Sequence, residues 1–140
     1  MRISARCDYA CKAVLELALH WPNSMPLQIQ EISDKQDIPL KYLPQILLQL
    51  KRLDIVESIR GKQGGYLLAK PPYEIQLGPL MREVGGPLLP VVNSATDKVS
   101  VFVTIWKEVE DSMAKVLDKI TFEDILKKEK GIEGAIVYQI

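Results

Sequence analysis

The chain has 140 residues, enough for one domain, or for a small domain with an appendage, that folds without disulfides or metals. Hydrophobic residues make up 47% and charged residues 26%, as is typical of globular proteins, and no apolar run is long enough to span a membrane. A net charge of zero disfavours nucleic acid as a partner, but residues 41–70 carry six basic and two acidic side chains. A solvated basic face is the simpler explanation of that local charge, and a DNA-docking element is the alternative.

The chain does not begin with the apolar core of a secretory signal peptide, and Cys7 and Cys11 are too close in sequence to staple a fold with a disulfide. We therefore expect a cytoplasmic protein with no membrane partner. The sequence has one histidine, no nucleophile–base spacing and no phosphate-binding loop, so it does not indicate an enzyme.

Three helices are predicted before residue 54. The first spans residues 8–21 and has an apolar face opposite a polar one. The polar face consists of Asp8, Lys12, Glu16 and His20. No partner for His20 is visible in the sequence, and we interpret it as a solvated surface residue. The second helix spans about residues 28–35, and the third follows a tight turn. The core positions of the third helix are Leu43, Ile46, Leu47, Leu50 and Leu53.

A change to strand-like periodicity predicts a β-hairpin with strands at residues 55–60 and 66–69. Three glycines between the strands permit the positive φ values that a hairpin turn needs. Three helices followed by a hairpin are the element order of a winged helix-turn-helix, in which the hairpin is the wing. A short fourth helix is predicted over residues 79–84, before Gly85-Gly86-Pro87 breaks it.

A long helix is predicted after a loop at residues 87–97. Its apolar residues recur with the alternating spacing of three and four that is typical of a coiled-coil seam. They are Val99, Phe102, Trp106, Val109, Met113, Val116 and Ile120. Such a stripe packs either on its own domain or on a second copy of the chain. Because the small amino-terminal domain offers little free core to cover it, we favour a homodimer.

Thr121 and Asp124 match a capping box that opens a further helix to about residue 130. From residue 131 the chain is predicted to be a tail, with a strand at residues 135–138 as the alternative. The predicted fold class is mainly α with a small β-hairpin wing. The winged helix-turn-helix domain is expected at residues 1–87, and the loop, the long dimerisation helix and the C-terminal helix or tail at 88–140.

DNA contacts are predicted on the third helix, which enters the major groove in a winged helix-turn-helix, and on the wing. The first turn of the helix presents Lys41, Tyr42 and Gln45, side chains that reach base edges and phosphates. The predicted wing contacts are Arg60, Gly61, Lys62, Gln63 and Gly64. On its own, a tyrosine at the start of a helix is more often a packing residue than a DNA contact. A glycine-rich hairpin, on its own, is more often only a turn. Their joint occurrence indicates DNA binding.

Residues 1–88 contain a series of short motifs. In chain order they are Tyr9-Ala10, Tyr42-Leu43 with Gln45, Ile55-Val56, Ser58, Arg60-Gly61, Gly64-Gly65-Tyr66, Leu68-Ala69, Pro71 and Ile75. Through these motifs and their order the chain resembles the Rrf2 family of bacterial winged-helix repressors, which regulate iron–sulfur assembly, the nitric oxide response and cysteine metabolism. The long helix matches loosely. The resemblance implies a homodimer crossed through that helix and a pseudo-palindromic operator. It also implies DNA contacts by Lys41, Tyr42, Gln45, Arg60 and Gly61.

Two departures from the family pattern carry information. Many members bind an iron–sulfur cluster through three cysteines in or beside the loop before the long helix, but residues 86–98 contain none, so we expect no cofactor. Asp8, near the place of a further ligand in some relatives, is then interpreted as a surface carboxylate. Pro44 stands where relatives commonly have an acidic residue that helps to choose operators. Because proline fits only the first turn of a helix, we expect the third helix to start near residue 40 or 41, or to bend there, and operator preference to differ.

Cys7 and Cys11 lie about one helical turn apart and are interpreted as small residues at the core edge. A thiol sensor or a two-cysteine metal half-site is the alternative. The function we favour is a sequence-specific DNA-binding transcription regulator that binds double-stranded DNA and responds to a small-molecule or protein effector. The alternative is a winged-helix protein-interaction module or a redox sensor that does not primarily use DNA binding.

Overall fold

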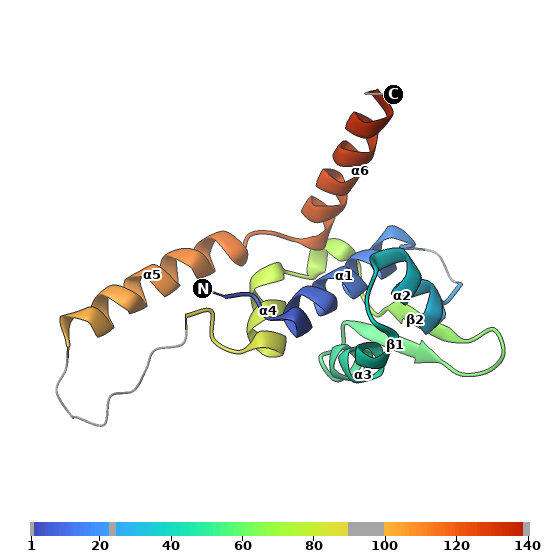
Figure 1. Cartoon of the computed structure of the whole chain (residues 1–140), viewed down its shortest axis with the longest axis horizontal. Coiled ribbons are helices and arrows are strands. Elements are labelled where there is room, and N and C mark those ends of the chain that lie inside the picture. The colour runs from blue at the N-terminus through green and yellow to red at the C-terminus, as the bar shows by residue number, and fades with distance from the viewer. Residues whose placement is uncertain (1, 23–24, 90–99, 139–140) are drawn as a thin grey trace.

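The computed structural model describes residues 2–22, 25–89 and 100–138 (Figure 1). A mainly helical body carries one two-stranded antiparallel sheet, and this confirms the predicted fold class. In chain order the elements are α1 (Ala5–Leu19), α2 (Ile29–Gln36), the 3-10 turn η1 (Leu40–Tyr42), α3 (Leu43–Arg52), β1 (Val56–Ile59), β2 (Gly65–Leu68), the 3-10 turn η2 (Pro72–Glu74), α4 (Leu77–Gly85), α5 (Val101–Leu117) and α6 (Phe122–Tyr138).

Helix α1 starts three residues earlier than predicted, because the hydroxyl of Ser4 caps it by accepting a hydrogen bond from the backbone N–H of Cys7 at 3.2 Å. The predicted polar face is only partly exposed. Glu16 is 5% exposed, and its carboxylate lies 3.1 Å from Nε2 of His20 and accepts a bond from the side-chain amide of Gln36 at 3.0 Å. His20, interpreted from the sequence as a solvated surface residue, is therefore half-buried and has a partner on its own helix.

Helix α3 begins two to three residues after the start near residue 40 or 41 that Pro44 led us to expect, and a 3-10 turn occupies the expected start. Residues 40–42 form a 3-10 turn, and the α-helix begins at Leu43 with Pro44 in its first turn, where a missing N–H leaves no helical bond unmade. The side chains of Leu43, Ile46, Leu47 and Leu50 are buried as predicted, and Leu53 packs against them half-buried.

The wing pairs Val56 with Leu68 at its base and Ile59 with Gly65 near its tip. A single residue from the segment before α2 extends this sheet, since Leu27 and Tyr66 exchange two backbone hydrogen bonds of 2.9 and 2.8 Å. Gly65 has a φ of +153°, and a Cβ there would collide with the backbone of Leu27. This close approach of two backbones requires glycine at that position.

The main core collects side chains from residues far apart in the sequence. Its largest fully buried side chains are Val14, Ile32, Ile38, Leu43, Ile46, Leu47, Leu50, Val56, Ile75 and Phe122. Phe122, the first residue of α6, is 1% exposed, and its N–H donates to the carbonyl of Ile75 at 2.9 Å. The predicted domain boundary at residues 87/88 stays a prediction, but the core includes a residue from beyond it.

Helices α5 and α6 extend from the body (Figure 1). Of the predicted seam, Val99 lies outside the described residues and Ile120 follows the end of α5. Helix α6 continues to Tyr138, so both the tail predicted from residue 131 and the alternative strand at 135–138 are wrong. One glycine inside a helix costs only about 1 kcal/mol, which is too little to end it at Gly131.

The capping box at the start of α6 is confirmed. The hydroxyl of Thr121 accepts from the backbone N–H of Asp124 at 3.2 Å, and the carboxylate of Asp124 accepts from the N–H of Thr121 at 3.0 Å. The hydrogen bonds from Thr121 also lower the pKa of Asp124 below its usual value.

We expect Thr121→Ala to lower the free energy of unfolding by about 1 kcal/mol, because the N–H of Asp124 loses its acceptor. Urea unfolding measures the change, and Thr104→Ala on the exposed side of α5 is the matched control. Equal unfolding midpoints for the two variants would contradict the capping role.

Candidate nucleic-acid interface

The recognition face of the molecule is the solvent-exposed row of η1 and α3, opposite the buried leucines. Its side chains are Lys41, Tyr42, Pro44, Gln45, Leu48 and Arg52. All three residues predicted to contact DNA from this helix are exposed. Sequence reasoning missed Leu48, which is 48% exposed and lies seven residues, about two helical turns, after Lys41. Such an apolar side chain suits the methyl group of thymine.

Tyr42 is held in place without being buried. Its ring stacks on the ring of Tyr9 from α1, with centroids 5.7 Å apart, and the ammonium of Lys41 lies 5.0 Å from the centroid of the Tyr42 ring. The side chain of Tyr42 nevertheless remains 45% exposed. Stacking restricts its rotamers, so a contact made by this residue requires little further ordering.

The wing presents Arg60 at the end of β1, and Lys62 and Gln63 at its tip, all of them exposed. Gly61 has a φ of +113°, and its carbonyl accepts from the N–H of Gly64 at 3.0 Å, which closes the turn. Gly64 itself is buried, and a Cβ there would collide with the backbone of Ile59. The turn alone therefore explains this glycine, and its contact with DNA stays a prediction.

The helix and the wing are fixed to each other, and they lie on the same side of the molecule (Figure 1). The ammonium of Lys51 at the end of α3 donates to the hydroxyl of Ser58 on β1 at 2.9 Å. On the other side of α3, the guanidinium of Arg6 donates twice to Oε1 of Gln49, at 2.7 and 3.2 Å. The amide of Gln49 in turn donates to the carbonyl of Glu83 at 3.1 Å, which ties α1, α3 and α4 together.

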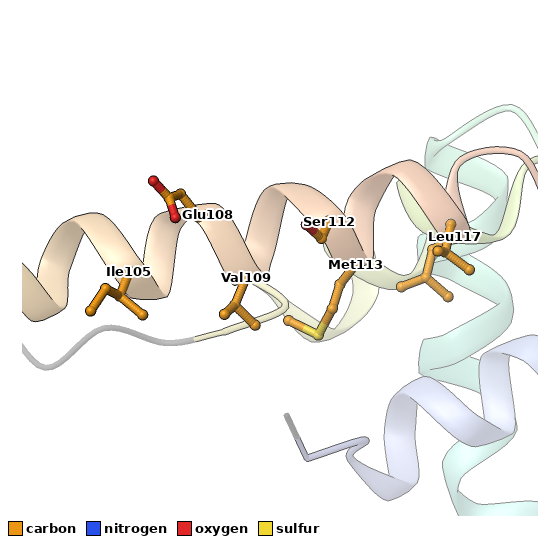
Figure 2. Close-up of a pocket in the computed structure, with 7 residues that line it drawn as sticks. Ile105, Glu108, Val109, Ser112, Met113 and Leu117 are labelled. Carbon is orange, nitrogen blue, oxygen red and sulfur yellow. The ribbon is translucent and has the colours of Figure 1, made fainter.

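Helix α5 presents an apolar surface that the described part of the chain covers only at the carboxyl-terminal end of the helix, where Met113, Ala114 and Leu117 pack half-buried against Cys7, Met81 and Leu88. None of its residues is buried, and Trp106, stacked on Phe102 with ring centroids 5.9 Å apart, is 44% exposed. The other exposed apolar side chains are Val101, Val103, Ile105, Val109 and Val116. This surface is wider than the predicted seam. A groove of about 630 Å³ runs along it, lined by Ile105, Val109, Met113 and Leu117 among others. Figure 2 shows these side chains on α5.

The two cysteines are free and lie on α1, Cys7 buried and Cys11 half-buried. Burial raises the pKa of the Cys7 thiol, and it raises that of Cys11 to about 12. Among the described residues, no group of three or more His, Cys, Asp or Glu side chains gathers to hold a metal ion. Asp8 is occupied by an ion pair with Lys12 at 2.9 Å.

A family model described as an iron-dependent transcriptional regulator, Rrf2, matches residues 3–128. The chain belongs to the Rrf2 family. CymR of Bacillus subtilis, an HTH-type transcriptional regulator, is 30% identical to this chain over 140 residues, and the alignment covers the full length of both proteins. Its solved structure covers 91% of this chain and 98% of CymR, with a TM-score of 0.79. The structure of IscR from T. potens, 32% identical, covers 92% of this chain and 88% of that protein, with a TM-score of 0.77.

Family membership identifies the chain as a DNA-binding transcription regulator of the winged-helix type, which is not an enzymatic role. No helix in the described residues is both long and apolar enough to cross a membrane. The whole chain has two cysteines, both on one helix, and no cysteine in the loop at residues 86–98.

Proposed function

We propose that the chain is a repressor that acts in the cytoplasm as a homodimer on a pseudo-palindromic operator. The observation that carries this proposal is the exposed row of Lys41, Tyr42 and Gln45 beside the exposed Arg60 of the wing. A helix and a wing held together by the Lys51–Ser58 bond reach a major groove and the adjacent backbone or minor groove as one unit.

The dimer is proposed to form through α5. Three residues of α5 pack half-buried on the body, but none of its 17 residues is buried, so a partner that covers its apolar side would stabilise it further. Two copies related by a two-fold axis would place two α3 helices on two half-sites, so operator symmetry would mirror that of the protein.

The two DNA-facing elements are assigned different tasks. Arg60, Lys62 and the backbone of Gly61 are proposed to bind the DNA backbone or the minor groove irrespective of sequence, with Gln63 and Gly64 beside them. Gln45 is proposed to read bases, because its amide offers a donor and an acceptor to adenine, while Lys41 and Tyr42 reach guanine or phosphate. Many relatives have an acidic residue on this face at the position of Pro44. Because proline has neither charge nor a hydrogen-bonding side chain, we propose that the operator preference of this chain differs from theirs.

We further propose that the regulator works without an iron–sulfur cluster. With two cysteines in the chain, three thiolate ligands from one copy are not available. The signal is then a small molecule or a protein partner. The relative CymR is the global cysteine regulator of B. subtilis, which supports a metabolic signal of this general kind.

One experiment tests cofactor and function together. Protein purified without oxygen is expected to show no visible absorption and to shift a fragment of its own promoter at low salt. A cluster absorption band would contradict the first part of the proposal. A spectrum without visible absorption, together with no binding of the promoter fragment at low salt, would favour the protein-interaction module.

We expect Gln45→Ala to relax base preference, reducing discrimination at its contacted position by about 1–3 kcal/mol while leaving binding to random DNA unchanged. Selection of binding sites from a randomised library measures this change. Gln76→Ala, an exposed glutamine before α4, is the control. An unaltered selected motif would contradict the assignment of Gln45.

A further inference from the structure

A pocket lies at the base of the wing, where the end of α1, the segment before α2 and both strands of the wing meet. We call it the wing-base pocket. Its volume is about 270 Å³, slightly below the range of about 300–1,000 Å³ that is typical of small-molecule sites. Among the described residues that line it, none is predicted to contact DNA and none belongs to α5. The pocket is therefore separate from the recognition face and from the proposed dimer surface.

Most of the residues that line the wing-base pocket are apolar or aromatic. Leu17, Leu27 and Leu68 are buried at its floor. Trp21, by contrast, is 40% exposed, and Tyr66 is half-buried. An indole ring that stays open to solvent beside buried leucines has apolar area to lose when a ligand covers it. The lining therefore favours a ligand with an apolar body.

The charge at this pocket is negative. Glu57 on β1 is exposed and lines it, and no lysine or arginine is among its described lining residues. His20 lines it as well, with the carboxylate of Glu16 behind the ring. Glu16 is 5% exposed, so its charge is poorly screened by water. Two carboxylates without a basic neighbour disfavour phosphates and carboxylates as ligands and attract a cation.

The imidazole of His20 is oriented by its neighbours. Its Nε2 lies 3.1 Å from the carboxylate of Glu16, which is itself fixed by the side-chain amide of Gln36 at 3.0 Å. A carboxylate accepts hydrogen bonds, so it holds the hydrogen of the neutral ring on Nε2 and leaves Nδ1 as an acceptor. An acceptor at this place suits a ligand that donates hydrogen bonds.

We propose that the wing-base pocket binds a small organic amine, a positively charged ammonium group on an apolar or aromatic body. The ammonium pairs with the carboxylate of Glu57 and lies against the ring of Trp21, while His20 accepts one of its hydrogens. Cation–aromatic attraction is strongest at tryptophan and grows when water is excluded. The body of the ligand covers the leucines at the floor. A neutral or anionic molecule of the same shape lacks the ion pair and the attraction to the ring.

The place of the pocket gives it a regulatory consequence, which rests on the function proposed above. Leu27 and Tyr66, which exchange two backbone hydrogen bonds of 2.9 and 2.8 Å, both line it. Glu57 lies directly opposite Leu67 in the sheet and three residues before Arg60. A ligand in the pocket would therefore fix the wing relative to α1 and α2. We expect the amine to act as the effector and to change operator affinity by at least about fivefold.

Phenethylamine, whose alkyl ammonium is charged at pH 7, tests the site without DNA. In a nuclear magnetic resonance titration of the full-length protein we expect saturable shifts of the pocket residues. Phenylpropionate and 2-phenylethanol carry the same ring with an anionic or a neutral end. Both should bind at least about tenfold more weakly, because neither offers a cation to Glu57.

Two variants and a matched control test the assignment of the residues. Glu57→Gln should weaken phenethylamine binding by about tenfold or more, and Trp21→Leu by about 5–30-fold. Glu74→Gln, which neutralises an exposed carboxylate in η2 outside the pocket, should bind as the wild type does. Glu57 and Trp21 are both exposed, so we expect both variants to fold. Circular dichroism checks that they do.

The absence of saturable shifts at the pocket would overturn the proposal. Tighter or equal binding of phenylpropionate would also overturn it, and so would equal affinities of Glu57→Gln and Glu74→Gln. Operator binding with and without phenethylamine is measured separately. A bound amine with unchanged operator affinity would overturn the regulatory consequence alone. Failure to bind any DNA would contradict the proposed function while leaving the amine site intact.

Discussion

The Trp106→Glu variant is expected to sediment as a monomer and to lose operator binding. Trp106 stacks on Phe102 in the middle of the exposed apolar surface of α5. A carboxylate at this position would be buried without a partner in the proposed interface, at a cost of about 3–5 kcal/mol for each unpaired charge. Dimer affinity should therefore fall more than about a hundredfold, and operator affinity should fall with it because each monomer binds only one half-site.

Lys107→Glu is the matched control for this variant. It places the same side chain one residue further along α5, at a position outside the predicted seam, and it should leave the dimer intact. Sedimentation equilibrium measures both variants. A Trp106→Glu dimer as stable as the wild type would contradict the assignment of α5 as the dimer interface.

The Arg60→Ala variant is expected to bind all DNA sequences more weakly, with no change in base preference. Arg60 is exposed at the end of β1, where the chain enters the wing turn. Removing one contact to phosphate or to the minor groove should reduce the slope of log affinity against log salt by about one for each chain. The contrast with Gln45→Ala separates positioning contacts from base reading.

Fluorescence anisotropy with operator and scrambled DNA, at several salt concentrations, measures this change. Lys127→Ala, which removes one positive charge from the exposed side of α6, controls for the change in net charge. A loss of affinity confined to the operator sequence would contradict the positioning role of Arg60.

Local patterns predicted the parts of this fold that local chemistry determines. The capping pair Thr121 and Asp124, the buried leucines of α3 and the glycine turn of the wing all follow from short-range spacing. The place of Pro44 in the first turn of α3 follows from its chemistry, because proline lacks the N–H that an interior helical position needs.

Contacts between distant residues were beyond the reach of such patterns. Periodicity placed Glu16 and His20 on one face, but the burial of that face depends on Gln36 at the end of α2. Phe122 enters a core built mainly by the first 75 residues, which no spacing in its own helix indicates.

The candidate site divides in the same way between local and tertiary features. The exposure of Lys41, Tyr42, Gln45 and Arg60 was predictable, because the element order of a winged helix-turn-helix sets their places, and their contacts with DNA stay predictions. The stacking of Tyr9 on Tyr42 and the meeting of Trp21, Glu57 and Tyr66 at one pocket arise only from tertiary packing. Gly64 was interpreted through DNA, although the turn alone requires a glycine there.

The salt dependence of binding to the promoter of its own gene tests the central claim most directly. A dimer that uses both recognition faces and both wings should make about 6–10 phosphate contacts, so its affinity should fall about 10³–10⁵-fold between 50 and 200 mM salt. The same titration with a scrambled fragment should start from a much lower affinity. Binding that is absent at low salt, or equal for the two fragments, would contradict a sequence-specific DNA-binding regulator.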